Sequence, residues 1–297
     1  MESVPNFSEG RRLETIERIV DAARSVEGVR VLDVHSDADH NRSVLTLVGE
    51  PDALQEAVFL ATSRASELID LRTHIGEHPR LGATDVVPFI PLTGTTMDEA
   101  VAVARSFGER VARELNIPVY FYEEAATRPD RRNLESVRRK GFEELREEIE
   151  DDDRAPDLGL RRIHPSAGAL VTGARGPLIA YNIYLGTSDL RVARAIARTV
   201  RYSTGGLRYV KALGIDTPAR GEVQVSMNLT NYRQSAIHTV FNLVKSEAEA
   251  HGVVVTESEI VGLVPLDALL DAARFYLRMH ALEPDQILEM RLLEAEN

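Results

Sequence analysis

Two kinds of hydrophobic spacing alternate along this chain, and their order constrains the fold more than any other feature of the sequence. Apolar residues recur every three or four positions, as on one face of a helix, in residues 11–25, 51–70 and 97–115. Short apolar runs of strand length occupy residues 29–34, 44–48, 85–90 and 118–122. After a short extended segment at residues 2–6, this order predicts an α+β fold, an α/β sandwich of the ferredoxin-like kind with helices on one face of the sheet.

The second half of the chain mixes strands and helices in a broadly similar order. Its strand-like runs are residues 178–185, 207–212, 222–229 and 253–256. Its helical runs are residues 188–200, 235–251, 267–277 and 284–293. A chain of 297 residues is long enough for two domains of ordinary size. We therefore expect one subdomain over residues 1–175 and a second over residues 176–297.

Composition excludes several kinds of site and partner. The sequence contains no cysteine, which rules out disulfide bonds, thiolate catalysis and zinc–sulfur sites. Its formal net charge of -12 makes it a poor general binder of nucleic acid. No run approaches the roughly 20 apolar residues of a membrane span, and no basic segment precedes an apolar run at the N-terminus. We expect a cytoplasmic protein that binds neither nucleic acid nor membranes.

One segment, HIGEHPRLGATDVVPFIP at residues 74–91, contains several reactive side chains. Gly76 and Pro79 prevent a long helix, so the segment should form a loop against the end of a sheet, where functional sites are common. His78 is our candidate general acid–base, because histidine titrates near neutral pH. A structural histidine is the ordinary alternative. A metal site at His74 and His78 would need both rings on one helical face, which the glycine and the proline disfavour.

Four further segments have ordinary interpretations beside functional ones. VPNFSEG at residues 4–10 ends the first strand and can cap the following helix, with Ser8 as the N-cap. HSDADHNR at residues 35–42 contains the turn formers Asp and Asn. The glycines of residues 159–176 can bring backbone N–H groups to a ligand or form a plain connector. Residues 127–154, basic and then acidic, are typical of a solvated helix with i,i+4 ion pairs, or of a surface that meets a partner.

Together these segments resemble the formiminotransferase family, the transferase half of vertebrate formiminotransferase–cyclodeaminase and its free-standing bacterial relatives. The matching stretches begin with VPNFSEG (4–10), NR (41–42), LID (68–70), GEHPR (76–80), GA (82–83), DV (85–86), PFIP (88–91) and PVY (118–120). Those that follow are VTGAR (171–175), Ala180, Asn182 and VGLVPL (261–266). The likeness covers nearly the whole chain and keeps its order.

The resemblance implies a fold and an assembly. It implies two ferredoxin-like subdomains, each a mixed sheet with helices packed on one face. It also implies a homodimer and a cleft between the subdomains.

The resemblance also implies which residues form the site. The family's catalytic histidine falls on His78. Its folate-contacting stretch falls on Gly159, Leu160, Arg161, Arg162, Ile163, His164, Pro165, Ser166, Ala167 and Gly168. Vertebrate sequences have an aromatic residue where this chain has Ala167, and an aspartate where it has His35. The acids that can orient the catalytic histidine are therefore Asp33, Asp37 and Glu77.

The activity that the resemblance implies is transfer of a formimino group from N-formimino-L-glutamate to N5 of tetrahydrofolate, giving 5-formiminotetrahydrofolate and L-glutamate, in histidine degradation. Tetrahydrofolate is the co-substrate, and we expect no metal. Arg42 and Arg80 are the candidates for the substrate carboxylates, because a guanidinium binds a carboxylate through two hydrogen bonds. Asn6 and Asn41 are further candidate binding residues. No cyclodeaminase domain follows Asn297, so we expect a separate cyclodeaminase downstream.

Three alternatives remain open on the sequence. The same site and histidine can serve formyl transfer between 5-formyltetrahydrofolate and glutamate, which the sequence does not separate from formimino transfer. A folate-binding homologue without catalysis is a second reading, against which the intact GEHPR motif (76–80) argues. A metal-dependent hydrolase is a third, and it rests only on the spacing of His74 and His78.

Overall fold

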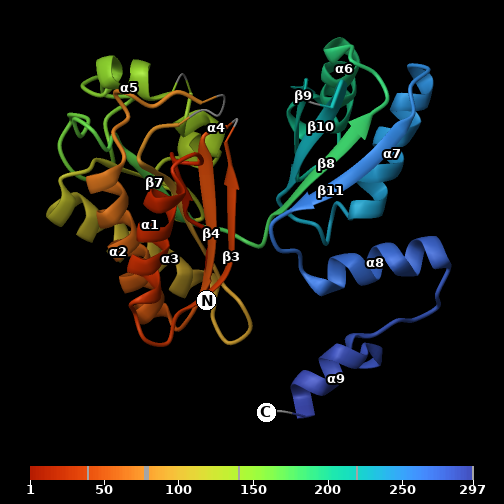
Figure 1. The fold of residues 1–297 in the computed structure, drawn as a ribbon, viewed down its shortest axis with the longest axis horizontal. Helices are drawn as coiled ribbons and strands as arrows, with labels where there is room; N and C mark the ends of the chain where they lie inside the picture. The colour runs from red at the N-terminus through yellow and green to blue at the C-terminus, as the bar shows by residue number, and fades with distance from the viewer. Residues whose placement is uncertain (39, 77–79, 140, 219, 296–297) are drawn as a thin grey trace. The chain divides into compact units, whose positions relative to one another are not determined.

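The computed structural model describes residues 1–38, 40–76, 80–139, 141–218 and 220–295 (Figure 1). The chain divides into two compact units, Met1–Arg175 and Gly176–Asn297. We call them the first unit and the second unit. Each combines one sheet with helices, so the predicted α+β class is confirmed.

The first unit begins with a βαββαβ arrangement. Its elements are β1 (Glu2–Ser3), β2 (Asn6–Phe7), α1 (Leu13–Arg24), β3 (Arg30–Asp37), β4 (Arg42–Val48), α2 (Pro51–Leu68) and β5 (Thr84–Ile90). β1 and β2 are two pieces of one N-terminal strand, since both pair with β4 on one side and β5 on the other. Pro5 lies between the pieces, where a residue without an N–H cannot continue the ladder. β3 completes the edge beside β4.

The first unit then extends its sheet with two parallel strands. The added elements are α3 (Met97–Arg110), the helical turn η1 (Val111–Leu115), β6 (Val119–Glu123), η2 (Pro129–Arg131), α4 (Leu134–Val137), α5 (Gly141–Glu148) and β7 (Leu170–Ala174). β7 lies between β5 and β6 and runs parallel to both. This sheet is therefore mixed, as predicted. A capping box at Thr96 and Glu99 begins α3.

The second unit has the same βαββαβ order. Its elements are β8 (Ile179–Leu185), α6 (Leu190–Val200), η3 (Tyr202–Thr204), β9 (Val210–Thr217), β10 (Glu222–Leu229), α7 (Ile237–Ala250), β11 (Val255–Val261), α8 (Leu266–Leu277), η4 (Pro284–Gln286) and α9 (Leu288–Ala295). The strand order is β11-β8-β10-β9, and every pair is antiparallel. The expectation of a mixed sheet here is corrected. The two βαβ crossings interleave, so each strand lies next to strands that run the opposite way.

Each unit has its own hydrophobic core between its sheet and its helices. In the first unit the core includes Ile19 of α1 and Leu45 of β4, and Phe89 of β5 meets Phe107 of α3 edge to face at 5.6 Å. In the second unit, alternate residues of β8 and β10 enter the core, such as Ile183. Burying one such side chain contributes roughly 1.5–3 kcal/mol. Helices cover one face of each sheet, as α1, α2 and α3 do in the first unit (Figure 1).

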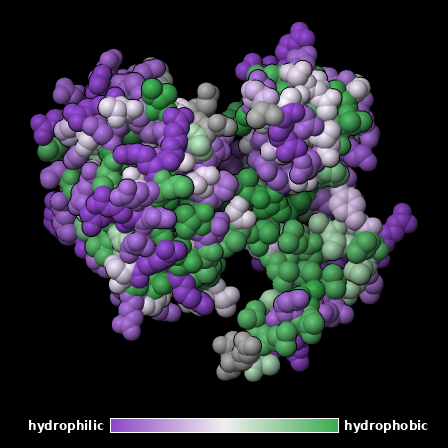
Figure 2. Space-filling view, viewed as in Figure 1, coloured by the Kyte–Doolittle hydropathy of each residue, from purple (hydrophilic) through white to green (hydrophobic). Residues whose placement is uncertain are grey.

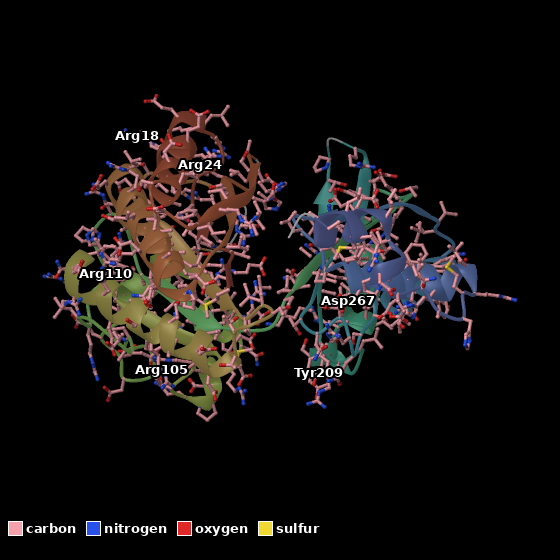
Figure 3. All side chains as sticks on the ribbon, turned by 90° about the horizontal axis from the view of Figure 1, so that it is seen from below. Arg18, Arg24, Arg105, Arg110, Tyr209 and Asp267 are labelled. Carbon is pink, nitrogen blue, oxygen red and sulfur yellow. The ribbon has the colours of Figure 1, made fainter. Side chains whose placement is uncertain are left out.

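The outer surfaces of the two units differ in polarity. Arginines of the first unit, such as Arg18, Arg24 and Arg105, are exposed on α1 and α3 (Figure 3). In the second unit, apolar side chains gather over α8 and α9 (Figure 2), including Phe275 and Leu288, which are 52% and 69% exposed. None of the helices in the described part of the chain is long and apolar enough to cross a membrane.

The segment between β6 and β7 differs from the solvated helix predicted over residues 127–154. It forms the short elements η2, α4 and α5, and two of its arginines, Arg131 and Arg154, are buried. Arg131 pairs with Asp157 at 2.8 Å, and both side chains are less than a tenth exposed. The spacing of charges in the sequence did not predict the burial of these arginines, because buried and solvated ion pairs use the same residue types.

Candidate functional site

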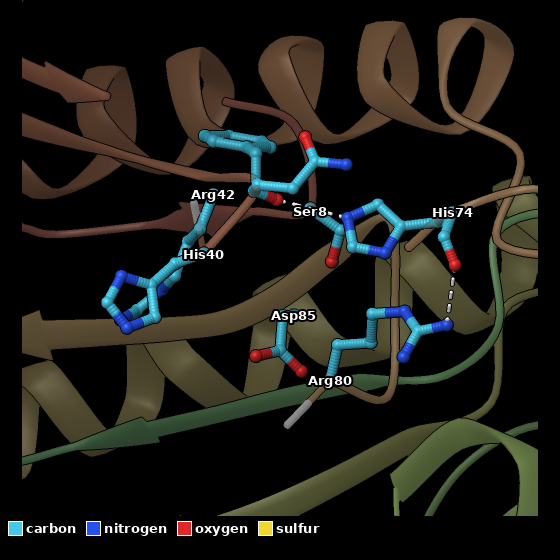
Figure 4. A pocket seen from close by; sticks show the side chains of 8 residues that line it. Ser8, His40, Arg42, His74, Arg80 and Asp85 are labelled. Carbon is cyan, nitrogen blue, oxygen red and sulfur yellow. Dashed lines mark hydrogen bonds between the residues drawn. The ribbon is translucent and has the colours of Figure 1, made fainter. Parts of the chain in front are cut away.

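A small pocket in the first unit forms where three segments far apart in the sequence meet (Figure 4). The segments are the end of β2, the turn from β3 to β4, and the loop that precedes β5. The lining residues are Phe7, Ser8, His40, Asn41, Arg42, His74, Arg80 and Asp85. In Figure 4, His40 and Arg42 lie on one side of the pocket, and His74 and Arg80 on the other. Predicted residues Asn41, Arg42 and Arg80 are thus brought together.

Asn41 holds the three segments together. Its backbone has a φ of 49°, in the left-handed region that asparagine adopts more readily than most residues. Its side-chain Oδ1 accepts a hydrogen bond from Gly10 N at 3.0 Å, and its Nδ2 donates to Ile75 O at 3.0 Å. Its own carbonyl accepts from His74 Nε2 at 3.0 Å. One residue therefore bridges β2, the turn and the loop.

Two glycines let these segments approach closely. A Cβ on Gly10 would overlap the backbone of Asp37 and Arg42, and one on Gly76 would overlap the carbonyl of His40. Any larger residue would push the segments apart. The glycines of the VPNFSEG and GEHPR motifs therefore have a geometric role at the pocket.

Asp37 lies opposite Arg42 in the strand pairing and organises one side of the pocket. Its carboxylate accepts from the backbone N of His40 at 2.9 Å and contacts His40 Nδ1 at 2.7 Å. Burial lowers the pKa of Arg42 to about 10, and the charge of Asp37 opposes that shift. Asp33, another predicted orienting acid, pairs with Thr46 farther along the strand and does not line the pocket.

His74 and Arg80 form the opposite side. Arg80 Nη2 donates to His74 O at 3.0 Å and to Glu143 Oε1 at 2.8 Å. Because the carbonyl of Asn41 can only accept, His74 Nε2 must carry the proton, which makes this ring a donor. Burial is the largest influence on His74 and lowers its pKa. At neutral pH His74 is therefore an uncharged residue that fixes the loop.

Asp85, at the floor of the pocket, pairs with a residue that the sequence did not single out. Its Oδ1 accepts from Leu81 N at 2.8 Å, and its Oδ2 forms an ion pair with Arg138. Arg138 is 13% exposed, whereas its neighbour Arg139 is 51% exposed. Sequence spacing offers no signal that distinguishes these two adjacent arginines.

The predicted folate-contacting stretch lies against the same loop. Leu71 N donates to Ser166 O and Ala83 N to Ala167 O, both at 2.9 Å, so the end of the stretch is joined to the segment that carries the pocket. Gly168 has a φ of +72°, and a Cβ there would overlap the backbone of Leu81. The start of the stretch is different, because residues 159–162 are exposed.

One sequence interpretation, the helix cap at Ser8, needs correction, and one predicted binding residue, Asn6, does not line the pocket. Ser8 does not cap the first helix, since its Oγ donates to Gly82 O at 2.7 Å. The N-cap residue of this helix is Arg12, which has no side-chain cap hydrogen bond, and Glu9 accepts from the backbone N of Arg11 and Arg12 just before the helix, at 2.9 Å each. Asn6 is buried in β2 and donates to Val4 O at 2.7 Å, so it does not line the pocket.

His78 and Glu77 lie outside the described residues, and their roles stay predictions. The residues on either side, Gly76 and Arg80, are described and belong to the loop beside the pocket. In the described part of the chain, no group of three or more His, Cys, Asp or Glu side chains is arranged to hold a metal ion.

Comparison with known proteins identifies the family. The model of the formiminotransferase domain, N-terminal subdomain, matches residues 1–175, and that of the formiminotransferase domain matches residues 180–291. The chain belongs to the formiminotransferase family. The predicted resemblance is thereby confirmed.

The family includes close relatives of similar length. The chain is 46% identical to a glutamate formimidoyltransferase of Streptococcus pyogenes serotype M1, over 99% of this chain and 98% of the relative. It is 47% identical to a glutamate formimidoyltransferase of Thermoplasma acidophilum, over 100% and 98%. It is also 45% identical to the formimidoyltransferase-cyclodeaminase of Rattus norvegicus, over 93% of this chain but 52% of that protein.

Proposed function

We propose that this chain is an enzyme that transfers the formimino group of N-formimino-L-glutamate to N5 of tetrahydrofolate, in histidine degradation. The products are 5-formiminotetrahydrofolate and L-glutamate. The observation that carries this proposal is the guanidinium-lined pocket built by the family's own motifs. Arg42 and Arg80 line it, and their positive charge suits a substrate with two carboxylates.

The reaction needs a group that moves one proton in each direction. The lone pair of N5 attacks the amidine carbon of the substrate, and a tetrahedral intermediate forms. Neutral His78 takes the N5 proton and then, as imidazolium, protonates the nitrogen of glutamate as the old C–N bond breaks. Histidine suits both steps because its pKa lies near working pH.

The described residues support this chemistry by orientation. In the proposed complex, Arg42 and Arg80 hold the glutamyl carboxylates. The two side chains lie on opposite sides of the pocket (Figure 4). Asn41 and His74 fix the loop in which the sequence places His78. Residues 164–168, joined to the same loop through Leu71 and Ala83, support folate binding beside the pocket.

The test is an absorbance assay of chelator-treated protein with tetrahydrofolate and N-formiminoglutamate, beside His78→Ala and the control His251→Ala. His251 is an exposed histidine of the second unit. We expect turnover in the wild type and in the control, and a loss of roughly 10²–10⁴-fold in His78→Ala. Near-normal turnover of His78→Ala would exclude its acid–base role. Turnover only with 5-formyltetrahydrofolate and glutamate would favour formyl transfer.

Three further properties belong to the same proposal. The enzyme works as a homodimer in the cytoplasm, and a separate cyclodeaminase consumes its product. The exposed apolar side chains of α8 and α9 are compatible with a dimer contact. Sedimentation equilibrium of the purified chain tests the assembly, and a monomer at micromolar concentration would contradict it.

A further inference from the structure

His74 carries an unshared electron pair on the pocket side of its ring. Its Nε2 donates to Asn41 O at 3.0 Å, so Nε2 holds the single proton of the neutral ring and Nδ1 is an acceptor. Nδ1 is buried and has no hydrogen-bond partner among the described residues. His74 lines the pocket, and Figure 4 shows Nδ1, the ring nitrogen that is not bonded to Asn41, on the side of the ring that faces Arg80.

Burial keeps this acceptor available. A ring that gained a second proton would have no lone pair left, and burial, the largest influence on the pKa of His74, disfavours that form. A buried acceptor without a donor costs free energy, because the hydrogen bond that it made to water has not been replaced. Only an N–H or O–H group can restore that bond, and a carboxylate cannot. The pocket therefore offers a ligand one place for a hydrogen-bond donor.

Arg80 offers a place for an anion beside this acceptor. Its Nη2 donates to His74 O at 3.0 Å, so the two residues are in direct contact. Its Nε is also buried without a partner in the part of the chain that the structure describes. Nε of Arg80 and Nδ1 of His74 are thus a donor and an acceptor that do not bond to each other. A ligand that carries a carboxylate and an N–H group close together satisfies both.

An N-formimino amino acid has this arrangement of groups. Its one-carbon group is attached to the nitrogen of the carbon that carries the α-carboxylate. The formimino group ends in an N–H, which donates a hydrogen bond, whereas a formyl group ends in an oxygen, which only accepts. An oxygen opposite Nδ1 would bring two acceptors together and leave both without a partner.

We infer that His74 is a specificity-determining residue, whose Nδ1 accepts a hydrogen bond from the terminal N–H of the formimino group and disfavours a formyl group at the same place. This inference rests on the proposed function for the identity of the amino acid. It deepens that function by naming the residue that separates the two one-carbon groups. His74 acts by binding, and the proposed proton transfer stays with His78.

The test compares the binding of three ligands to the full chain by calorimetry, without tetrahydrofolate and therefore without turnover. The ligands are N-formimino-L-glutamate, N-formyl-L-glutamate and L-glutamate. We expect the wild type to bind the formimino ligand roughly 10- to 100-fold more tightly than the formyl ligand, the usual effect of leaving a buried acceptor unpaired. A wild type that binds both ligands equally would overturn the inference.

One variant separates the acceptor from the structural bond of His74. In His74→Gln the amide N–H replaces Nε2 as the donor to Asn41 O, but no acceptor remains at the place of Nδ1. Its preference for the formimino ligand should largely disappear, while L-glutamate, which has no one-carbon group, should bind as before. His251→Gln, at an exposed histidine of the second unit, is the matched control and should keep the preference. An undiminished preference in folded His74→Gln would count against the inference.

Nitrogen NMR of the wild type with isotope-labelled histidine is a second measurement, and it needs no folded variant. A bare ring nitrogen and one that accepts a hydrogen bond resonate at different frequencies. The Nδ1 resonance of His74 should move when N-formimino-L-glutamate is added, and much less when N-formyl-L-glutamate is added. If the free protein already showed the resonance of a hydrogen-bonded nitrogen, the chain itself would supply the donor and the inference would be wrong.

The outcomes distinguish this inference from the proposed function. Wild-type turnover together with equal binding of the formimino and formyl ligands would reject the inference and leave the proposed reaction intact. A formimino preference that His74→Gln removes, in a chain without turnover, would support the inference and reject the proposed reaction.

Discussion

The two units build the same hairpin at the same place in their chain order, and in the first unit the residues at its end line a pocket. In the first unit Asp37 pairs with Arg42, and in the second unit Thr217 pairs with Glu222, so the two turns have the same length. In both turns, the residue just before the second member of this pair, Arg42 or Glu222, has a positive φ. It is Asn41 in the first unit, with a φ of 49°, and Gly221 in the second, with a φ of 68°.

The comparison shows what the asparagine contributes. At Gly221 a Cβ would meet nothing within 4 Å, so this glycine does not permit a close approach. It only adopts the left-handed conformation without steric cost. At Asn41 the side chain adds two hydrogen bonds to other segments. The two units thus share the backbone turn, and in the first unit the side chains at its end bind other segments and line the pocket.

The charge at the end of the turn also differs. Arg42 enters the pocket, whereas the equivalent residue Glu222 pairs with Arg220 at 3.2 Å on the surface. An anionic substrate would therefore be attracted to the turn of the first unit and not to that of the second.

The largest effect is expected when a left-handed glycine beside the pocket gains a side chain. Gly168→Ala should cost about 3 kcal/mol, since it adds a backbone overlap of roughly 1–3 kcal/mol to a left-handed penalty of roughly 1–2 kcal/mol. Gly221→Ala should show only the left-handed penalty, about 1 kcal/mol. Urea unfolding followed by circular dichroism measures both. Equal losses would mean that the close approach at Gly168 does not matter.

An intermediate effect is expected at Asn41. Asn41→Ala should cost about 2 kcal/mol, because it leaves Gly10 N and Ile75 O without their partner. Asn41→Gly should cost about 1 kcal/mol less than Asn41→Ala, because glycine accepts the positive φ. Both variants should lose at least about tenfold in turnover. The reciprocal change Gly221→Asn should alter neither stability nor turnover, and a large effect there would break the comparison.

The smallest effect concerns pH. Burial lowers the pKa of His164 below 6.5, and His164 Nδ1 accepts from Ala167 N at 3.0 Å, which requires the neutral ring. Above 6.5 neither the folded nor the unfolded chain binds this proton, so the stability is fully present there. As pH falls below 6.5 the unfolded chain binds it first, and the first unit loses stability. His74 acts in the same direction.

A titration-free variant tests this dependence. His164→Asn keeps an acceptor for Ala167 N but cannot titrate, so its thermal midpoint should fall less than that of the wild type between about pH 7.5 and about pH 5.5. Hydrogen exchange should show the acid-induced loss of protection in the first unit. An equal fall in both proteins would assign the pH dependence to other groups.

Spacing of apolar residues predicted much of the fold. The helix expected over residues 51–70 is Pro51–Leu68, and that over 97–115 is α3 followed by η1. The pattern did not predict the break between β1 and β2, nor the antiparallel sheet of the second unit. Strand direction depends on which strands become neighbours, and that is decided by tertiary packing rather than by local spacing.

The sequence predicted those pocket residues that lie in the family's motifs. Asn41, Arg42 and Arg80 were predicted and do line one pocket. Arg138 was not predicted, because its burial arises only when the segment between β6 and β7 folds back onto the loop before β5. A contact between such distant positions leaves no periodic signal in a single sequence.

The bridging role of Asn41 has a consequence for how substitutions combine. The end of β2, the turn and the loop share this one amide, so their contributions to stability are thermodynamically coupled. Once one substitution has displaced a segment and broken its hydrogen bond to Asn41, a second substitution in another segment removes less stabilisation. Double-mutant cycles across Gly10, Asn41 and Gly76 should therefore be sub-additive, and the pocket should be gained or lost as a single cooperative unit.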